Sequence, residues 1–172
     1  MVYYYKLNKI TRKDIYPLLR INKLLDSLGN IAVFLILDIY LGFYQIEVDS
    51  KSCEKTAFVM KYGTYQYNRL SMSLCNSPAT FQHLVDIIFA GSLRNYMVTY
   101  INNLNIYSKM NNDHFQYLRK VFKWIHLAGL LLNPEKCEFF KSLISFLGYV
   151  ISADGITTDP AKIEKVTNFP KL

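Results

Sequence analysis

Two short apolar runs, Tyr96–Ile101 and Leu104–Ser108, flank a pair of asparagines and constrain the fold more than any other segment. Both runs are rich in the branched and aromatic side chains that strands favour. Asn102 and Asn103 tolerate the left-handed backbone of a two-residue turn. The segment therefore predicts a β-hairpin with the two amides at its tip. A turn that merely closes two strands explains the pair equally well at this stage.

A second apolar run, Ile31–Ile39, predicts a buried strand that carries an acidic residue, Asp38, near its end. A carboxylate in such a place is costly unless it is exposed, paired or bound to a metal ion, although capping the following turn is an alternative. If this strand lies beside the hairpin in one sheet, Asp38, Asn102 and Asn103 converge.

The apolar periodicity of the remaining chain predicts further helices and strands. Helices are expected at 21–28, from 77 to about 91, from about 113 to 129, and from Asp159-Pro160 to Pro170. Strands are expected at 43–48 (or a turn into a strand), 56–60, 64–67, 130–132, 137–140 and 143–151. Two helices have apolar stripes that predict core-facing surfaces: Phe81, Leu84, Val85, Ile88, Phe89, and Phe115, Leu118, Val121, Phe122, Ile125. This order predicts an α+β domain, an antiparallel sheet with helices packed on one face.

The composition narrows the class of protein. The 172 residues are 51% hydrophobic, which suits one globular domain. The longest purely apolar run, Ile31–Leu37, is far shorter than the ~20 residues of a membrane span, and the N-terminus does not resemble a secretory signal. We therefore expect no membrane association and an intracellular location, cytoplasmic or nuclear.

The possible metal-binding residues and the net charge narrow the kinds of metal site and partner that we expect. The 3 cysteines and 3 histidines lack ligand spacing, so any metal site must use oxygen ligands. The net charge of +7 favours a polyanionic partner such as nucleic acid, although scattered surface lysines explain the same charge.

Ordered sequence blocks run through nearly the whole chain. They are Val2–Leu18, Leu37–Ile46, Lys55–Gly63, Asn76–Gln82, Tyr100–Asn103, Leu132–Phe139, Phe146–Tyr149 and Asp159-Pro160. In this order they resemble the reverse transcriptase of long-terminal-repeat retrotransposons of the Ty3/gypsy class. The resemblance implies a polymerase palm over residues 1–172, with the fingers largely absent and the thumb and ribonuclease H absent.

The family reaction adds deoxynucleotides to a primer 3′ end on an RNA or DNA template. The resemblance therefore implies a nucleic acid template-primer and a deoxynucleoside triphosphate as partners, and Mg²⁺ as cofactor. The catalytic positions that it implies are Asp38, Asn102, Asn103 and Lys136, with Asp38 as metal ligand and Lys136 as proton donor to pyrophosphate. The implied nucleotide-binding positions are Ile39, Phe43, Met72 and Ser73. The implied template or primer positions are Gln82, Tyr100, Leu147 and Gly148.

The residues that depart from the family pattern lie at its catalytic and nucleotide-binding positions. Asn102 and Asn103 stand where the family has two aspartates, and Ser71-Met72-Ser73 replaces its Pro-Phe-Gly. An amide carries no net charge to hold a divalent ion. The sequence therefore predicts an inactive or strongly impaired enzyme. A nucleic-acid-binding module without catalysis and a decayed retroelement relic are the alternatives.

Overall fold

An antiparallel sheet of four strands, in the order β4-β5-β1-β6, forms the centre of the computed structural model, which describes residues 2–16, 31–92, 95–160 and 164. The strands are β1 (Val33–Asp38), β4 (Met97–Tyr100), β5 (Asn103–Ser108) and β6 (Glu138–Lys141). The strand expected at Ile31–Ile39 and the hairpin around the asparagines are therefore both confirmed. β1 runs antiparallel to both β5 and β6, so it lies in the interior of the sheet.

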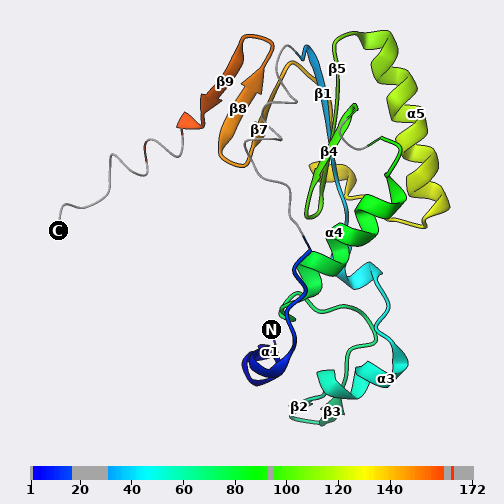
Figure 1. Cartoon of the computed structure of the whole chain (residues 1–172), viewed down its shortest axis with the longest axis vertical. Helices are drawn as coiled ribbons and strands as arrows, with labels where there is room; N and C mark the ends of the chain where they lie inside the picture. The colour runs from blue at the N-terminus through cyan, green and yellow to red at the C-terminus, as the bar shows by residue number, and fades with distance from the viewer. Residues whose placement is uncertain (1, 17–30, 93–94, 161–163, 165–172) are drawn as a thin grey trace.

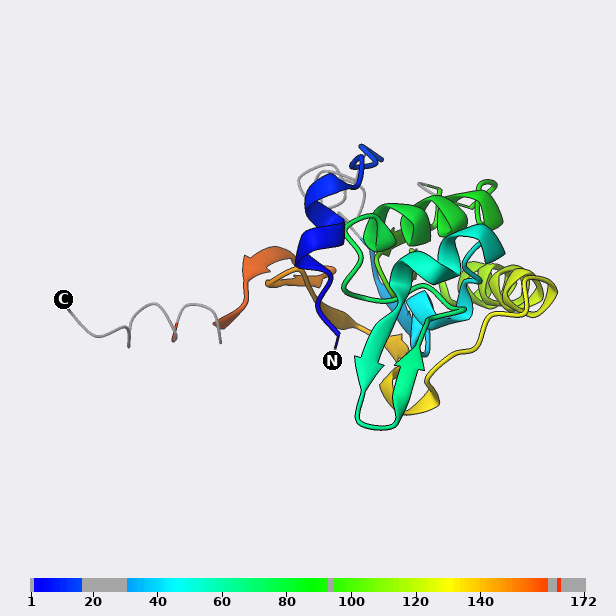
Figure 2. The same ribbon diagram turned by 90° about the horizontal axis from the view of Figure 1, so that it is seen from below.

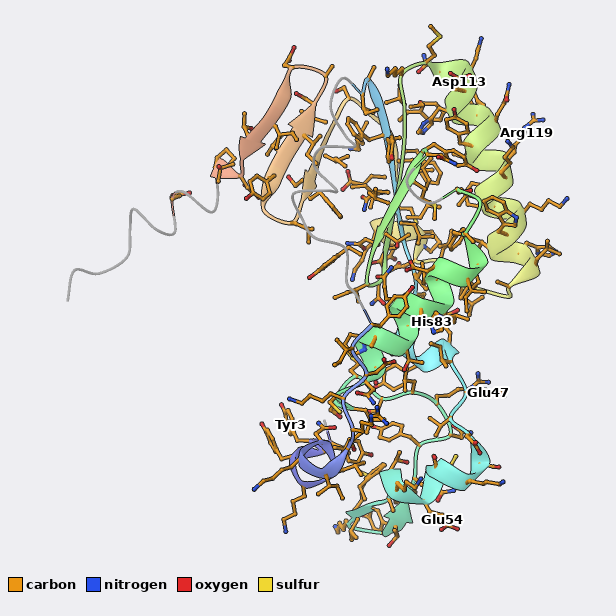
Figure 3. The ribbon with its side chains drawn as sticks, in the orientation of Figure 1. Tyr3, Glu47, Glu54, His83, Asp113 and Arg119 are labelled. Carbon is orange, nitrogen blue, oxygen red and sulfur yellow. The ribbon has the colours of Figure 1, made fainter. Side chains whose placement is uncertain are left out.

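Two helices, α4 (Ser77–Ile88) and α5 (Asn111–Leu127), cover one face of this sheet (Figure 1). Their apolar stripes pack on alternate sheet residues in the main core, as expected from the sequence. The buried members of this core are Leu35, Leu37, Ile39, Phe43, Phe81, Val85, Phe89, Tyr96, Met97, Leu104, Ile106, Val121, Ile125 and Leu130. Figure 3 shows the opposite side of α5, where Asp113 and Arg119 point away from the sheet.

The first turn of α5 differs from the prediction. Phe115 is 52% exposed, whereas its neighbour His114 is fully buried. The nitrogen Nδ1 of His114 lies 3.0 Å from Oγ of Ser108 at the end of β5. This polar contact, together with the ring of Phe140 against both His114 and Phe115, places the histidine inward.

A small second sheet packs on the other face of the central sheet (Figure 1). Its strands are β7 (Leu143–Phe146), β8 (Tyr149–Ser152) and β9 (Gly155–Thr158). Phe34, Val98 and Tyr107 of the central sheet meet Ile144, Phe146 and Ile151 there. The prediction of one long strand at 143–151 is wrong, because Leu147 and Gly148 have positive φ angles of 53° and 81° and reverse the chain.

A third group of elements lies below the central sheet in Figure 1: α1 (Tyr5–Ile10), α3 (Ser50–Cys53), η2 (Glu54–Thr56), β2 (Phe58–Met60) and β3 (Gly63–Tyr65). The β2–β3 hairpin confirms the strand pair expected there, although its loop has only Lys61 and Tyr62 between the strands. In Figure 2 this hairpin projects from the body of the molecule. The hydroxyl of Tyr4 donates to the carbonyl of Thr56 at 2.6 Å and joins the N-terminal segment to η2.

The chain after β1 also differs from the prediction. Residues 42–45 form the 3₁₀ helix η1 (Gly42–Gln45), and the strand considered for 43–48 is reduced to one bridge between Glu47 and Arg69, so the alternative of a turn into a strand describes this segment better. Leu41 has a left-handed backbone (φ 46°) that turns the chain sharply out of β1 and into this helix. The strand predicted at 130–132 is reduced to one bridge between Leu132 and Ile39, followed by η3 (Pro134–Lys136).

Two predicted helices, at 21–28 and from Asp159-Pro160 to Pro170, lie largely outside the described residues. Within the part of the chain that the structure describes, no helix has the length and apolar character needed for a membrane span.

Candidate functional site

The register of the sheet brings the three predicted residues together. Asp38 is the direct partner of Asn103 across β1 and β5, and the amide of Ile39 donates to the carbonyl of Asn102 at 2.8 Å. The expected convergence of Asp38 with the two asparagines is therefore confirmed at the level of the backbone. The turn itself lies one residue earlier than predicted, because Asn103 already pairs with Tyr100 and Ile101 takes the positive φ of 52°.

The side chains of the three residues do not share one direction. Phe34 and Ile36, which alternate with Asp38 along β1, pack toward the second sheet, so Asp38 and Asn103 lie on that face. Asn102 turns the other way. Its Oδ1 is buried, has no hydrogen-bond partner, and lies only 2.6 Å from where a Cβ on Gly42 would be. Only glycine fits at position 42, since such a Cβ would also lie 2.7 Å from the ring of Phe81.

A cavity of about 270 Å³ opens where β1, η1, the hairpin turn and η3 meet. Its lining contains Asp38, Ile39, Tyr40, Leu41, Gly42, Phe43, Tyr44, Met72, Asn102, Asn133 and Lys136. The structure thus groups most of the predicted catalytic and nucleotide-binding residues around one space. Two candidates are missing from this lining, namely Asn103 and Ser73. The hydroxyl of Ser73 instead donates to the carbonyl of Val2 at 2.6 Å, which ties the 71–73 segment to the N-terminal segment before α1.

The walls of the cavity are held by contacts between distant segments. Phe43 is 8% exposed and packs edge-on against Phe81 of α4, with ring centroids 5.4 Å apart. The amide of Asn133 donates to the carbonyl of Asp38 at 2.8 Å, and the side chain of Gln45 bonds both backbone groups of Leu131. These contacts fix the loop after α5 against the end of β1.

Sequence reasoning missed several of the lining residues, including Asn133, Tyr40 and Tyr44. Asn133 and Tyr44 belong to blocks that resemble the family, and that resemblance was their only sequence signal. Burial raises the pKa of Tyr44, and the nearby Tyr67 adds to the shift. Tyr44 therefore lines the cavity as a neutral hydroxyl.

The residues predicted to contact template or primer lie around the hairpin. Gln82 is 2% exposed, and its side chain bonds Oγ1 of Thr99 at 2.8 Å and the amide of Ile101 at 3.3 Å. It supports the hairpin from α4 and has little surface of its own. Tyr100 packs edge-on against Phe146 of β7. Leu147 and Gly148 form the β7–β8 turn.

The oxygen donors of the site are few. Among the described lining residues, Asp38 is the only carboxylate. No group of three or more His, Cys, Asp or Glu side chains is placed to hold a metal ion within the described part of the chain. One carboxylate and neutral amides give a donor set of low charge.

Comparison with known proteins identifies the family. Residues 1–151 match the family model described as reverse transcriptase (RNA-dependent DNA polymerase). The chain is 37% identical to the retrovirus-related Pol polyprotein from transposon 297 of Drosophila melanogaster over 167 residues, which are 97% of this chain and 16% of the polyprotein. It is 31% identical to the Pol polyprotein from transposon gypsy of the same organism (96% and 16%) and to the transposon Tf2-3 polyprotein of Schizosaccharomyces pombe (96% and 12%).

Solved structures agree on the fold. The foamy viral protease-reverse transcriptase in complex with RNA/DNA hybrid superposes with a TM-score of 0.89 at 22% identity. That match covers 100% of this chain and 23% of the viral protein. The same viral enzyme in complex with double-stranded DNA gives 0.89 at 22% identity, over 96% of this chain and 29% of the other. The fold is therefore the α+β palm of a polymerase. By sequence and by fold, the chain belongs to the reverse transcriptase (RNA-dependent DNA polymerase) family.

Proposed function

We propose that this chain is the palm of a retrotransposon reverse transcriptase whose polymerase activity is lost or strongly impaired. The family reaction is the template-directed addition of deoxynucleotides to a primer 3′ end. The observation that supports the proposal is the pairing of Asp38 with Asn103 across β1 and β5, beside a cavity that Asn102 and Lys136 also line. The positions of the family's three aspartates are thus together, but only one of them is a carboxylate.

The expected loss is large. A unit charge about 4 Å from a divalent ion contributes ~8 kcal/mol before desolvation, at an effective dielectric constant of about 20. A third of this, roughly 2.7 kcal/mol, corresponds to about 100-fold in rate for each carboxylate that is replaced. Two replacements, Asn102 and Asn103, therefore bring polymerisation close to background.

The residues present do not fit a pair of Mg²⁺ ions. The reverse transcriptase family is in general dependent on divalent metals, and Mg²⁺ prefers several charged oxygen ligands in octahedral geometry. Among the described residues that line the cavity, Asp38 is the only carboxylate, and the buried Oδ1 of Asn102 faces the backbone of Gly42 and the ring of Phe81. We therefore assign no catalytic step to a metal ion in this chain.

A nucleic-acid-binding module without catalysis is the second candidate. The net charge of +7 favours it, because lysines and arginines gain affinity for phosphates by releasing counterions. The related viral enzyme was solved with RNA/DNA hybrid and with double-stranded DNA, and we propose the same class of partner here. On this proposal Tyr100, Leu147 and Gly148 lie at the primer, and Gln82 positions the hairpin turn.

A primer-extension assay tests the main proposal. The chain as it stands and its Asn102→Asp/Asn103→Asp variant are compared with an RNA template and a DNA primer, in Mg²⁺ and in Mn²⁺. We expect extension at background for the chain and a gain of at least about 100-fold for the variant. Extension by the unmodified chain at the rate of the variant overturns the proposal.

Duplex binding without extension separates the second candidate from a decayed relic. Affinity for an RNA/DNA hybrid that falls steeply with salt supports the binding module, since phosphate contacts release counterions. A folded chain that shows no such binding supports the relic.

A further inference from the structure

A second cavity, of about 440 Å³, lies where α1, the loop between η1 and α3, and the first turn of α4 meet. Figure 1 shows α1 and α3 below the lower end of α4. None of the described residues that line this cavity also lines the cavity beside Asp38. Small-molecule sites in proteins typically have volumes of about 300–1,000 Å³. The position and the size are therefore those of a separate binding site.

Two asparagines hold the walls of this second cavity together. The side chain of Asn8, in α1, donates to the carbonyl of Ser73 at 2.8 Å and accepts from the amide of Cys75 at 2.9 Å. The side chain of Asn76 donates to the carbonyl of Arg12 at 3.0 Å. These hydrogen bonds fix α1 and the chain after it against the loop that precedes α4. The cavity is therefore preformed.

The interior of the second cavity is largely apolar. Five aliphatic side chains of its lining are only partly buried in the structure. They are Leu7, Ile46, Val48, Leu70 and Leu74. The buried hydroxyl groups of the lining already have backbone partners, because Thr56 donates to the carbonyl of Cys53 at 2.6 Å and Ser77 donates to the carbonyl of Ser71 at 2.5 Å. A ligand thus meets apolar surface there, and covering that surface is favourable.

One charged group of the same lining lacks an opposite charge. Glu47 is paired with Arg69 at 3.2 Å, and the carboxylate of Asp49 accepts from a backbone amide in the first turn of α3. Nζ of Lys55 lies 3.3 Å from the neutral Oγ of Ser52. Among the described residues, no carboxylate forms an ion pair with Lys55. The cavity therefore combines an apolar interior with one ammonium group that is free to pair with an anion.

We propose that this second cavity binds a small apolar carboxylic acid, with its hydrocarbon part against the five aliphatic side chains and its carboxylate at Lys55. Burial of the hydrocarbon part supplies most of the affinity, and the charged hydrogen bond to Lys55 orients the ligand. The site lies apart from the catalytic positions, so it is independent of the proposed function. Because the walls come from α1, the α3 region and α4, a bound acid also stabilises the contact between the N-terminal segment and the rest of the chain.

The thiol of Cys75 lines the second cavity and can report whether it is occupied. The test measures alkylation of the folded chain by N-ethylmaleimide, with and without decanoate below its micelle concentration, by mass spectrometry of the cysteine-containing peptides. Cys137 is the internal control, because it is partly buried like Cys75 but does not line this cavity. We expect saturating decanoate to slow alkylation of Cys75 by about threefold or more, because a bound ligand covers the lining, and to leave Cys137 unchanged. Protection of both cysteines, or of neither, overturns the proposal.

Two substitutions test the role of the ammonium group. We expect Lys55→Gln to raise the dissociation constant of decanoate about fivefold, the size expected for a partly exposed ion pair. Lys51→Gln, which is exposed and lies outside the lining, should leave that constant unchanged. The uncharged 1-decanol should bind equally well to the chain and to Lys55→Gln. Equal weakening of decanoate by both substitutions, or equal weakening of decanoate and 1-decanol by Lys55→Gln, would overturn the assignment of the carboxylate to Lys55.

Discussion

The two ends of β5 each carry a buried polar atom without a partner, but their surroundings differ. Before the strand begins, Oδ1 of Asn102 has no hydrogen-bond partner and its residue lines an open cavity. Beyond the strand's other end, Nε2 of His114 is also unpartnered, but the residue is fully buried and the ring of Phe140 packs on it. An unpaired buried atom lowers stability at both ends. Only at the open end does its residue also line a cavity.

The largest expected effect is on the rate of primer extension. It tests whether the site beside the open end of β5 can catalyse the family's reaction. In the Asn102→Asp/Asn103→Asp variant, replacing Asp38 by Asn removes one of three carboxylates. We expect primer extension to fall about 100-fold from the level of that variant. Extension rates measured with the same template-primer check this value. A rate that does not change would separate Asp38 from the chemistry and remove the basis for our assignment of the site.

The next-largest expected effect is on stability. It concerns the close packing of Gly42 against Asn102 and Phe81 at the open end. Gly42→Ala places a Cβ 2.6 Å from Oδ1 of Asn102 and 2.7 Å from the ring of Phe81. We expect a loss of about 1–3 kcal/mol in the free energy of unfolding, because the hairpin turn or α4 must shift. Urea denaturation measures the loss, and Gly91→Ala is the matched control, since nothing lies within 4 Å of a Cβ there. Equal free energies of unfolding for the two variants would show that the hairpin turn shifts at little energetic cost.

A third buried polar group without a partner, in the middle of β5, sharpens the comparison. Asn105 is 1% exposed, its Nδ2 has no partner, and it does not belong to the cavity lining. It should therefore behave like the enclosed end. We expect Asn105→Leu to raise the free energy of unfolding by about 1 kcal/mol, since the buried and unpaired Nδ2 is removed. Asn112→Leu, on the exposed start of α5, serves as the control in the same denaturation experiment. A lower free energy of unfolding for Asn105→Leu would contradict the assignment of Asn105 to the behaviour of the enclosed end.

The smallest effect is a pH dependence at the enclosed end. Burial lowers the pKa of His114 below its ordinary value. The unfolded chain therefore binds a proton near pH 6.5 while the folded chain does not, so stability decreases as the pH falls through and below 6.5. The slope is at most about 1.4 kcal/mol per pH unit for one group.

Denaturation of the chain and of His114→Gln between pH 7.5 and 5, roughly the range in which histidine titrates, measures this slope. We expect the variant to lose the histidine's contribution. His126→Gln, at an exposed position of α5, should keep it. An unchanged slope in His114→Gln contradicts the proposed cause.

Much of the scaffold is predictable because burial imposes a period on the sequence. The run at Ile31–Ile39 and the stripe of α4 have the periods of a buried strand and an amphipathic helix, and both are present in the structure. The meeting of Asp38 with the hairpin follows from placing those elements in one antiparallel sheet. Each of these features depends on many residues whose spacing indicates the same element.

The features that were mispredicted each depend on one or two residues. Leu41, Ile101 and Leu147 all adopt positive φ angles, which no propensity for leucine or isoleucine indicates. Tertiary packing determines these turns, so η1, the position of the hairpin turn and the break between β7 and β8 were misplaced. His114 is buried in place of Phe115 because Ser108 offers a polar partner that lies six residues away in sequence. The cavity depends on the same turns, which is why Asn133 and Tyr44 were missed.

The hydrogen bond from the amide of Ile39 to the carbonyl of Asn102 has a kinetic consequence. The side chain of Ile39 belongs to the main core, so this amide becomes available to solvent only when the hairpin turn separates from the end of β1. Its hydrogen-exchange rate thus measures the opening of the candidate site directly. Any molecule that holds the turn and the strand end together should slow exchange at this one amide, whether or not a reaction follows.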